Sequence, residues 1–422
     1  MAKYDVVVVG AGLSGLSAAL HLQNEGLNVK LLEAAGAPGG RVRTDHIDGF
    51  LLDRGFQVLL TAYPEAQRQL HYAALKLCPF YPGVLTFFNE NLHRISNPWQ
   101  MPLTALPALW SPISSWRDKM KIVALRNRLK RLNSNGIFEQ PEQSTLDFLR
   151  EWRFSETFMQ SFLLPFAKGV LLDKDLQTSS RLFEFIFKMF AEGNAALPTE
   201  GMEMIPRFLA AQLAPEVLKT NAKVARIEKN KVKTESGETF EANILLIATD
   251  PVQANALLGN PEPVPMNGTW CFYFSTDKAP INDPVLLLNG SGKGVVNHVC
   301  FPSLVNPLYA PTDRHLVSVS VVNDEGMSES ELLVAIKKEL RGWFKKEVRY
   351  WEHLKTYHIP QALPQKKQIH LPEKKHIAPI KQGIYCCGDH TQTPSINGAL
   401  ESGRMVADAI SWHLAVGKKG DK

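Results

Sequence analysis

The chain has 422 residues, enough for about two or three domains, and its 45% hydrophobic and 21% charged content is ordinary for a globular protein. The formal net charge of +5 is small, so we expect no nucleic-acid partner. No apolar run reaches about 18 residues, and the N-terminal one is too short for a signal peptide or a membrane span. The sparse, odd set of cysteines favours a reducing, cytoplasmic compartment over a disulfide framework. These cysteines are Cys78, Cys271, Cys300, Cys386 and Cys387.

The first part of the chain has the pattern of a strand, a tight glycine turn, a helix and a second strand. The uninterrupted valines 6–9 are typical of a parallel strand buried on both faces. Gly10, Gly12 and Gly15 then match G-x-G-x-x-G, whose glycines allow a tight turn, close approach of a pyrophosphate and close helix–strand packing. The helix predicted over residues 13–24 directs its free N–H groups and positive dipole end at that phosphate.

Glu33 ends the second strand, where its carboxylate can accept hydrogen bonds from an adenosine ribose. An acidic residue at this place argues against a cofactor that bears a 2′-phosphate. With all parts of the unit present, the pattern predicts dinucleotide binding rather than a glycine-rich turn of an unrelated α/β fold. The predicted contacts are Gly10, Gly12, Leu13, Ser14, Gly15, Glu33 and Ala34.

The next stretch, GAPGGRVRTDHIDGFLLDRGFQVL, resembles the superfamily of flavin-dependent amine oxidases, protoporphyrinogen oxidases and phytoene desaturases. Gly39, Gly40, Arg41 and Thr44 match its G-G-R-x-x-T-like motif. The resemblance implies that Arg41 contacts the pyrophosphate of FAD and that the glycines let the loop pass beside the flavin. An arginine fork suits a diphosphate whose charge a helix terminus compensates only in part. Residues 50–57, FLLDRGFQ, resemble the short strand and Asp-x-Gly turn near the isoalloxazine.

Residues 383–390, GIYCCGDH, resemble the last strand of the FAD domain and its exit turn. Neighbouring side chains of a strand point to opposite faces, so the paired cysteines are expected to be buried strand residues and no metal site is predicted. The resemblance places Gly388 and Asp389 beside the flavin, where the carboxylate binds a ribityl hydroxyl or lies near the pyrophosphate. The helix that follows would direct its first N–H groups at the flavin N1–C2=O edge. It supplies the predicted contacts Asn397, Gly398 and Ala399.

Helical patterns dominate the middle of the chain. Residues 116–132 carry seven Lys and Arg against one Asp, with apolar residues on one helical face. We interpret this segment as a lid helix with a solvated basic face; contact with an acidic membrane surface is the alternative, which the apolar stretch 103–116 keeps open. The phenylalanines of a later helix are interpreted as core, with the wall of an apolar pocket as the alternative. They are Phe183, Phe185, Phe187 and Phe190.

Several later segments predict how the chain returns to the dinucleotide-binding unit. Residues 198–202 resemble the family's Pro-x-x-Gly-Met turn, although Glu200 stands where the family usually has a first glycine. Residues 217–251 predict three or four short strands with a hairpin, and the resemblance packs Val224 against the adenine. Residues 268–360 predict an antiparallel sheet with one helix, which would cover the flavin.

The predicted fold class is α/β (α+β overall), with a Rossmann-like FAD-binding domain, a mixed-sheet substrate domain and a helical insertion. The FAD-binding domain is expected to be discontinuous, over residues 1–61, 198–255 and 375–415. The mainly helical insertion or lid would occupy residues 62–197, and the antiparallel-sheet substrate domain residues 256–374.

The sequence has no zinc-ligand spacing, no G-x-S-x-G elbow and no P-loop lysine, so the chemistry is assigned to FAD. A single dinucleotide fingerprint favours oxidation or desaturation of an apolar small molecule, with hydride passing to flavin N5 and electrons to oxygen, a quinone or another acceptor. Non-covalent binding is expected because PSINGA, residues 394–399, stands where some amine oxidases carry the attached cysteine. No catalytic side chain is assigned.

Two other functions are compatible with the same fold. One is a flavin-dependent isomerase or mutase without net redox change, and the other is a non-catalytic binding protein of the Rab GDP-dissociation-inhibitor type. The retained Glu33, Arg41 and Asp389 argue against the binding protein. The sequence does not specify the substrate, the electron acceptor or the oligomeric state.

Overall fold

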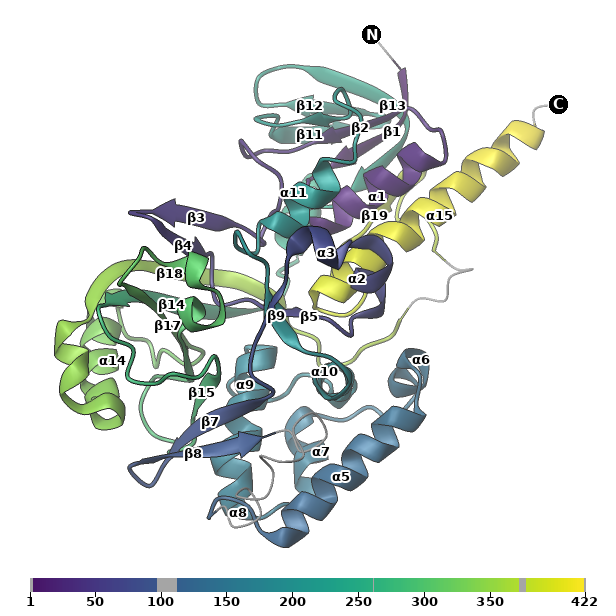
Figure 1. Cartoon of the computed structure of the whole chain (residues 1–422). Coiled ribbons are helices and arrows are strands. Elements are labelled where there is room, and N and C mark those ends of the chain that lie inside the picture. Colours follow the sequence, from purple (N-terminus) through teal and green to yellow (C-terminus); the bar gives the residue numbers. More distant parts are fainter. Residues whose placement is uncertain (1–2, 97–111, 261, 372–376, 421–422) are drawn as a thin grey trace.

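The computed structural model describes residues 3–96, 112–260, 262–371 and 377–420. A sheet covered by long helices carries both ends of the described chain, and a second sheet and a group of helices lie at the other end of the molecule (Figure 1). The α/β class predicted from the sequence is confirmed, and the solved structures reported below share the fold.

The first sheet has the strand order β10-β2-β1-β13-β12-β11, with β19 also paired to β13. The pairs among β10, β2, β1, β13 and β19 are parallel, whereas β11, β12 and β13 pair antiparallel. Its strands are β1 (Lys3–Val9), β2 (Val29–Leu32), β10 (Leu218–Lys219), β11 (Val224–Glu228), β12 (Lys231–Thr234), β13 (Thr239–Ile247) and β19 (Ile384–Cys386).

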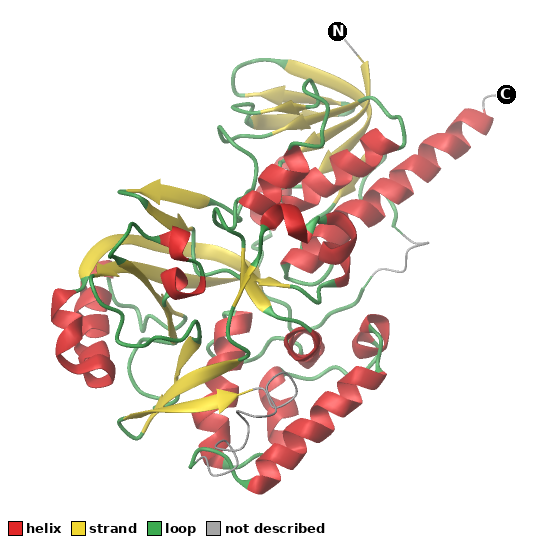
Figure 2. Cartoon of the chain, viewed as in Figure 1, coloured by secondary structure: helices red, strands yellow, loops and turns green. Residues whose placement is uncertain are grey.

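The valine run of β1 explains the centre of this sheet. Val6, Val7 and Val8 are fully buried, and Val8 pairs with Leu246 of β13. A strand buried on both faces requires helices on the sheet, and α1 (Leu13–Asn24), α11 (Met204–Ala210) and α15 (Ile396–Gly420) lie together beside it (Figure 2). The close packing of α15 on α1 depends on Gly403, where a Cβ would lie 2.2 Å from the Ser14 carbonyl oxygen.

The second sheet has the order β18-β14-β17-β16-β15-β7-β8. Neighbours are antiparallel except β15 and β7, which are parallel, so the antiparallel sheet expected from residues 268–360 is observed with one parallel pair added. Its strands are β7 (Gly83–Phe88), β8 (Asn91–Ser96), β14 (Met266–Thr276), β15 (Leu286–Asn289), β16 (His298–Cys300), β17 (His315–Val321) and β18 (Glu352–Pro364).

The hairpin β7–β8 lies inside residues 62–197, which the sequence predicted as mainly helical. Its strand β7 pairs with β15, with Leu85 opposite Leu287, so this part of the predicted insertion belongs to the second sheet. The turn residues Asn89 and Glu90 both have positive φ, 47° and 62°, which is the backbone of a tight two-residue hairpin. Neither residue is glycine, and for that reason the turn was not recognised from the sequence.

Two small sheets connect the larger parts: β3 (Thr44–Ile47) with β4 (Phe50–Asp53), and β9 (Ala195–Leu197) between β5 (Leu59–Leu60) and β6 (Cys78–Pro79). The remaining longer helices are α5 (Trp116–Arg131), α7 (Thr145–Glu151), α9 (Leu164–Leu171), α10 (Ser180–Glu192), α12 (Pro251–Leu258) and α14 (Glu329–Phe344). The short helical segments are α2 (Pro64–Gln69), α3 (Tyr72–Leu75), α6 (Ser134–Phe138), α8 (Glu156–Phe158), η2 (Met159–Leu163), α13 (Pro302–Val305), η3 (Pro307–Tyr309) and η4 (Lys345–Tyr350).

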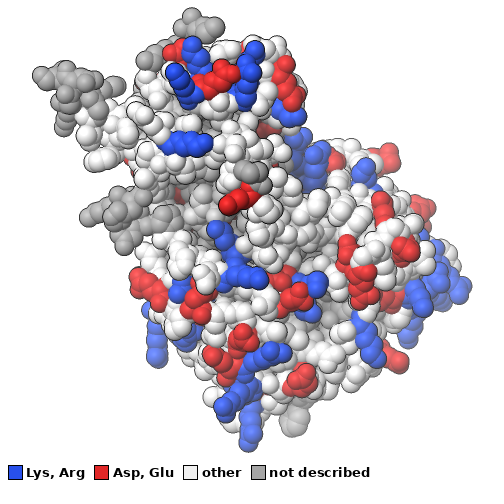
Figure 3. All heavy atoms as spheres, turned by 180° about the vertical axis from the view of Figure 1, so that it is seen from behind, with Lys and Arg blue, Asp and Glu red and all other residues white. Residues whose placement is uncertain are grey.

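The predicted basic helix is α5. Its Leu125 and Leu129 are buried, and Arg128 forms an ion pair with Glu184 of α10, so its apolar face packs on the helical region. This packing agrees with the interpretation as a covering helix. The apolar stretch 103–116 that precedes it lies outside the described residues as far as residue 111. On the face of the molecule seen in Figure 3, basic and acidic side chains are interspersed. Within the described chain, no helix combines the length and apolar character that a membrane crossing requires.

Asp53, at the end of β4, joins three parts of the fold. One carboxylate oxygen accepts hydrogen bonds from the Thr44 hydroxyl, at 2.6 Å, and from the Met202 backbone N–H, at 2.9 Å, while the other accepts one from the Tyr309 hydroxyl at 2.9 Å. Burial raises the pKa of Asp53 to about 6, and the three hydrogen bonds oppose that rise only in part.

We expect the variant Asp53→Asn to be more stable than the wild type at pH 7. Between pH 4 and pH 7, its free energy of unfolding should rise relative to that of the wild type by on the order of 2–3 kcal/mol. The folded wild type keeps the Asp53 proton up to about pH 6, whereas the unfolded chain releases it near pH 4. The free energy of unfolding therefore falls as pH rises between these values. Asparagine avoids this loss because its oxygen can accept from Thr44 and Met202 while its amide donates to the Tyr309 hydroxyl oxygen. Denaturant unfolding at pH 4, 5.5 and 7 measures the difference.

The neighbouring Asp45 supplies the matched control. Burial opposes its charged form, but hydrogen bonds from Arg54 and Tyr357 outweigh that effect and lower the pKa of Asp45. Asp45→Asn should therefore be less stable than the wild type at pH 7. Because the pKa of Asp45 lies below its usual value in the folded chain, this difference should change little between pH 4 and pH 7. An equally small change for Asp53→Asn over the same range would show that the account of Asp53 is wrong.

Candidate flavin site

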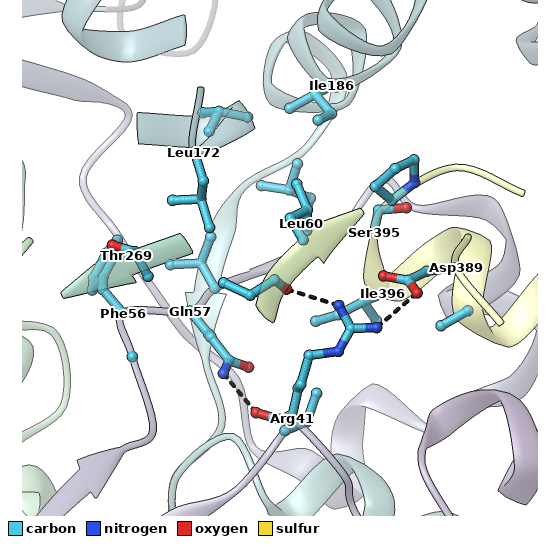
Figure 4. A pocket seen from close by; sticks show the side chains of 18 of the residues that line it. Arg41, Phe56, Gln57, Leu60, Leu172, Ile186, Thr269, Asp389, Ser395 and Ile396 are labelled. Atoms are coloured by element: carbon cyan, nitrogen blue, oxygen red, sulfur yellow. Dashed lines mark hydrogen bonds and ion pairs between the residues drawn. The ribbon is translucent and has the colours of Figure 1, made fainter. Parts of the chain in front are cut away.

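A continuous cavity of about 1020 Å³ begins at the carboxyl end of the parallel strands and extends into the space between the second sheet and the helical region. Its volume lies at the upper end of the range, roughly 300–1,000 Å³, that is typical of ligand sites. Its wall combines the loops after β1, β2 and β19 with side chains from α9, α10, β15 and β16. Figure 4 shows part of this wall, with Arg41, Asp389 and Ile186 labelled. A ligand bound along its whole length would therefore contact both sheets.

The three fingerprint glycines have three different environments. Gly10 has a φ of +101°, and a Cβ there would lie 2.9 Å from the Ala248 carbonyl oxygen, so the turn itself requires glycine. A Cβ on Gly12 would meet nothing within 4 Å, and Gly12 lines the cavity, so a ligand can approach its backbone. A Cβ on Gly15 would lie 1.9 Å from the Gly10 carbonyl oxygen, which accounts for the close packing of α1 on the turn.

The first turn of α1 faces the cavity with Leu13 and Ser14. Gly12 is the N-cap of this helix and has no side chain to cap it. The backbone N–H groups of a first helical turn lack partners within the helix and carry the positive end of its dipole. Gly39 and Gly40 pass beside this turn: the Gly39 N–H donates to the Ala11 carbonyl at 2.8 Å, and both residues line the cavity.

Glu33 and Ala34 line the cavity immediately after β2. The Glu33 carboxylate accepts backbone hydrogen bonds from Ala11, at 2.7 Å, and from Ala35, at 2.8 Å, each on a different oxygen. These bonds hold the carboxylate in place and leave each oxygen a second lone pair, which is what two ribose hydroxyls would need. Val224, at the start of β11, lines the same end of the cavity.

Arg41 and Asp389 form an ion pair in the cavity wall. The Nη2 atom of Arg41 lies 2.7 Å from Oδ1 of Asp389, and its Nη1 atom donates to the Ala362 carbonyl at 2.7 Å (Figure 4). Asp389 is almost fully buried, whereas the Arg41 side chain is 35% exposed and lines the cavity. Burial opposes the charge of Arg41, but the attraction and hydrogen bond of Asp389 outweigh it and raise its pKa. A permanent cation is thus held where a diphosphate would lie.

The segment 394–399 closes the other side of the site. Pro394, Ser395, Ile396 and Ala399 line the cavity, while Asn397 and Gly398 are not among the lining residues. Asn397 instead accepts a hydrogen bond from the Glu65 backbone N–H at 2.9 Å, and Gly398 leaves room for Thr393, whose carbonyl oxygen would be 2.0 Å from a Cβ. Both residues therefore shape the start of α15. Ser395 caps it by accepting from the Gly398 N–H at 3.0 Å.

Most of the predicted contacts share this cavity. Gly15, Asn397 and Gly398 support its wall from behind, as described above. The predicted residues that line it are Gly10, Gly12, Leu13, Ser14, Glu33, Ala34, Gly39, Gly40, Arg41, Val224, Gly388, Asp389 and Ala399. The chemistry of this set fits FAD, since it offers unpartnered helical N–H groups and a fixed cation for a diphosphate, and a held carboxylate for a ribose.

The far end of the cavity is apolar. Of the four phenylalanines whose role was left open, Phe187 and Phe190 line the cavity, whereas Phe183 and Phe185 are buried in the core. Phe183 and Phe185 are therefore core residues, and Phe187 and Phe190 form part of the wall of an apolar pocket. Phe56, Phe162 and Phe166 add further aromatic wall, and Tyr357 and His358 of β18 line the cavity as well.

The stretch GIYCCGDH adopts the expected strand and turn. Ile384–Cys386 pairs with β13. The expectation of two buried strand cysteines holds only in part, because Cys386 ends the strand half-buried and the fully buried Cys387 follows it. Burial raises the pKa of the Cys386 thiol to about 11. A neutral, buried thiol is a poor nucleophile and a poor metal ligand. Among the described residues, no group of three or more His, Cys, Asp or Glu side chains could hold a metal ion.

Several lining residues were not predicted from the sequence. Asp250 and Lys223 line the ribose end, and His298 lines the apolar end. They come from loops and strands without a recognisable motif. The only available signal was position: Asp250 directly follows the buried strand NILLIAT, at the sheet edge where α/β folds bind ligands.

The cavity thus has a polar end at the Rossmann-like strands, whose chemistry fits a dinucleotide, and a second, mainly apolar end. The family model described as flavin containing amine oxidoreductase matches residues 13–411. The chain belongs to this family and is thus a flavin-dependent oxidoreductase.

Individual relatives agree with this assignment. A 15-cis-phytoene desaturase of Solanum lycopersicum is 23% identical over 99% of this chain and 80% of its own length. Protoporphyrinogen oxidase 2 of Arabidopsis thaliana is 29% identical over 39% of this chain, and the match spans 32% of that relative. A solved oxidoreductase from Methanosarcina mazei superposes with a TM-score of 0.74 at 17% identity, covering 96% of this chain and 99% of its own. A putrescine oxidase with bound putrescine superposes with a TM-score of 0.68 at 18% identity, over 97% of this chain and 99% of its own. At such identities the structural matches establish the fold alone.

We expect Arg41→Lys to weaken FAD binding roughly 10- to 100-fold, the equivalent of one charge-assisted hydrogen bond. Lysine keeps the charge but has no planar fork, so it cannot bond Asp389 and the Ala362 carbonyl together while facing a diphosphate. Reconstitution of the apoprotein, followed by flavin fluorescence quenching, measures the dissociation constant. Arg226→Lys is the control, because Arg226 forms a surface pair with Glu228 at 2.7 Å. Equal affinities for both variants would contradict the assignment of Arg41.

Proposed function

We propose that the chain binds FAD non-covalently and oxidises or desaturates a predominantly apolar small molecule. One observation carries this proposal: a single cavity connects the nucleotide-binding residues at the Rossmann end with an aromatic chamber between the second sheet and the helices. Bound flavin would supply hydride acceptance at N5, with electrons passing on to oxygen, a quinone or another acceptor.

The residues of the chain would orient the two ligands and exclude water. Glu33, Arg41 and the first turn of α1 would hold the dinucleotide part. The phenylalanines of α9 and α10 would hold an apolar substrate by burying its surface, which stabilises binding by about 25 cal/mol per Å². None of the five cysteines, all of which lie in the described chain, is among the cavity-lining residues, and this supports non-covalent binding.

We also propose a cytoplasmic location, supported by five cysteines that are all free. Peripheral membrane contact is the alternative proposal, and it rests on α5. At the start of this helix Trp116 is 71% and Met120 51% exposed, beside several basic residues.

An anaerobic screen of apolar substrates tests the proposed reaction. Mixing the purified holoprotein with a true substrate should bleach the flavin absorption near its visible maximum in a single turnover, and air or a quinone should restore the colour. Candidate classes are tetrapyrrole precursors, polyenes and alkylamines, each with an already oxidised analogue as control. Turnover of a substrate without bleaching, and without a change in its redox state, would contradict oxidation and identify an isomerase.

A further inference from the structure

His298 is a buried polar residue in the apolar end of the cavity. It begins β16, is 4% exposed, and lines the cavity. We call this end of the cavity the apolar chamber. Its wall is formed by Phe56, Phe162, Phe166, Val170, Leu288 and His298. The imidazole ring of His298 lies 5.0 Å from the Phe56 ring, centroid to centroid, at an interplanar angle of 62°.

The neighbouring Asn297 determines which nitrogen of His298 carries the proton. The side-chain Nδ2 of Asn297 donates to the Pro165 carbonyl at 3.2 Å, and a carbonyl can only accept, so the orientation of the amide is fixed. The same Nδ2 lies 3.0 Å from Nδ1 of His298. An amide nitrogen can only donate, so Nδ1 must be the unprotonated acceptor and Nε2 must carry the hydrogen.

The Nε2–H group of His298 has no hydrogen-bond partner among the described residues. Leaving a buried donor unsatisfied costs about 1–3 kcal/mol, so such groups need an explanation. Burial lowers the pKa of His298 to about 4, which keeps the imidazole neutral at pH 7.

Helix α9 holds the imidazole in this orientation. Its Gly169 packs directly against the pair: a Cβ there would lie 2.6 Å from Nδ2 of Asn297 and 3.2 Å from Nδ1 of His298. The missing side chain lets the helix backbone, including the Pro165 carbonyl, reach Asn297. The imidazole is therefore held by contacts between α9 and the segment Asn297–His298.

We propose that His298 determines substrate specificity by donating its Nε2–H to an oxygen acceptor on an otherwise apolar substrate. This inference rests on the proposed function and narrows its substrate class to apolar molecules with a carbonyl, ester or ether oxygen. A protonated amine is disfavoured, because a neutral donor cannot compensate a cation removed from water. The Nε2 atom itself is buried in the structure, so binding includes a movement of a neighbouring ring, such as that of Phe56, when the oxygen approaches.

Two uncharged probes of equal size test the donor directly: 2-nonanone, which has an acceptor oxygen, and decane, which has none. Calorimetric or flavin-spectral titration of the holoprotein gives their affinities for the wild type and for His298→Phe. We expect the substitution to weaken 2-nonanone binding about tenfold more than decane binding, the equivalent of one hydrogen bond. His358→Phe, in the same cavity but stacked on Trp270, is the control and should change both affinities alike. An equal effect of His298→Phe on both probes would overturn the inference.

A measurement on the wild type covers the case in which His298→Phe does not fold. The ¹⁵N spectrum of histidine-labelled holoprotein should contain one imidazole that is protonated at Nε2 and stays neutral from pH 5 to pH 8. Its Nε2 resonance should shift with 2-nonanone and not with decane. An Nδ1–H tautomer, or no shift with either probe, would overturn the inference.

The outcome can be separated from failure of the proposed function. A coloured protein whose flavin is bleached by substrates, but which does not distinguish the probes, overturns the role of His298 alone. A protein without flavin overturns the proposed function, while calorimetry with the two probes still reports on His298.

Discussion

The ion pair between Arg41 and Asp389 is the contact on which the site depends. It joins the loop after β2 to the turn after β19, two segments that are 348 positions apart in the sequence, and the second bond of Arg41 to Ala362 adds the end of β18. The segments after β2 and β19 of the first sheet and the last part of β18 of the second sheet therefore meet at one guanidinium. An almost fully buried carboxylate such as Asp389 is stable only with a partner, because an unpaired buried charge costs several kcal/mol.

This arrangement explains why a discontinuous domain can form one binding site. The parallel strands β2, β1, β13 and β19 all end at the same edge of the sheet, so their following loops meet there. The Rossmann loops supply helical N–H groups and the held carboxylate of Glu33, while the segment after β19 supplies Asp389 and the start of α15. The second sheet then extends the same cavity away from the polar groups into an aromatic chamber. The residues proposed to hold the dinucleotide thus lie at one end, and the other end is mainly apolar, although Arg126 of α5 also lines the cavity.

The sequence was informative where backbone chemistry restricts the residue type. Gly10 and Gly15 could be placed because a Cβ at either position would clash with the backbone, Gly12 because the spacing of the motif includes it, and the valines of β1 because only a doubly covered strand is apolar throughout. The hairpin β7–β8 could not be placed, since its turn uses Asn89 and Glu90 in a conformation that usually selects glycine. The role of Asn397 in holding α2, and the orphan donor of His298, arise only from tertiary contacts with residues far away in the chain.

The central claim is that the two ends of the chain form one non-covalent FAD site. The most direct measurement is the flavin content of the purified, FAD-reconstituted protein before and after denaturation, read by absorbance and by chromatography of the supernatant. The account predicts one FAD per chain, released intact when the protein is precipitated with acid. A protein that takes up no FAD, or whose flavin stays with the precipitated polypeptide, would contradict it.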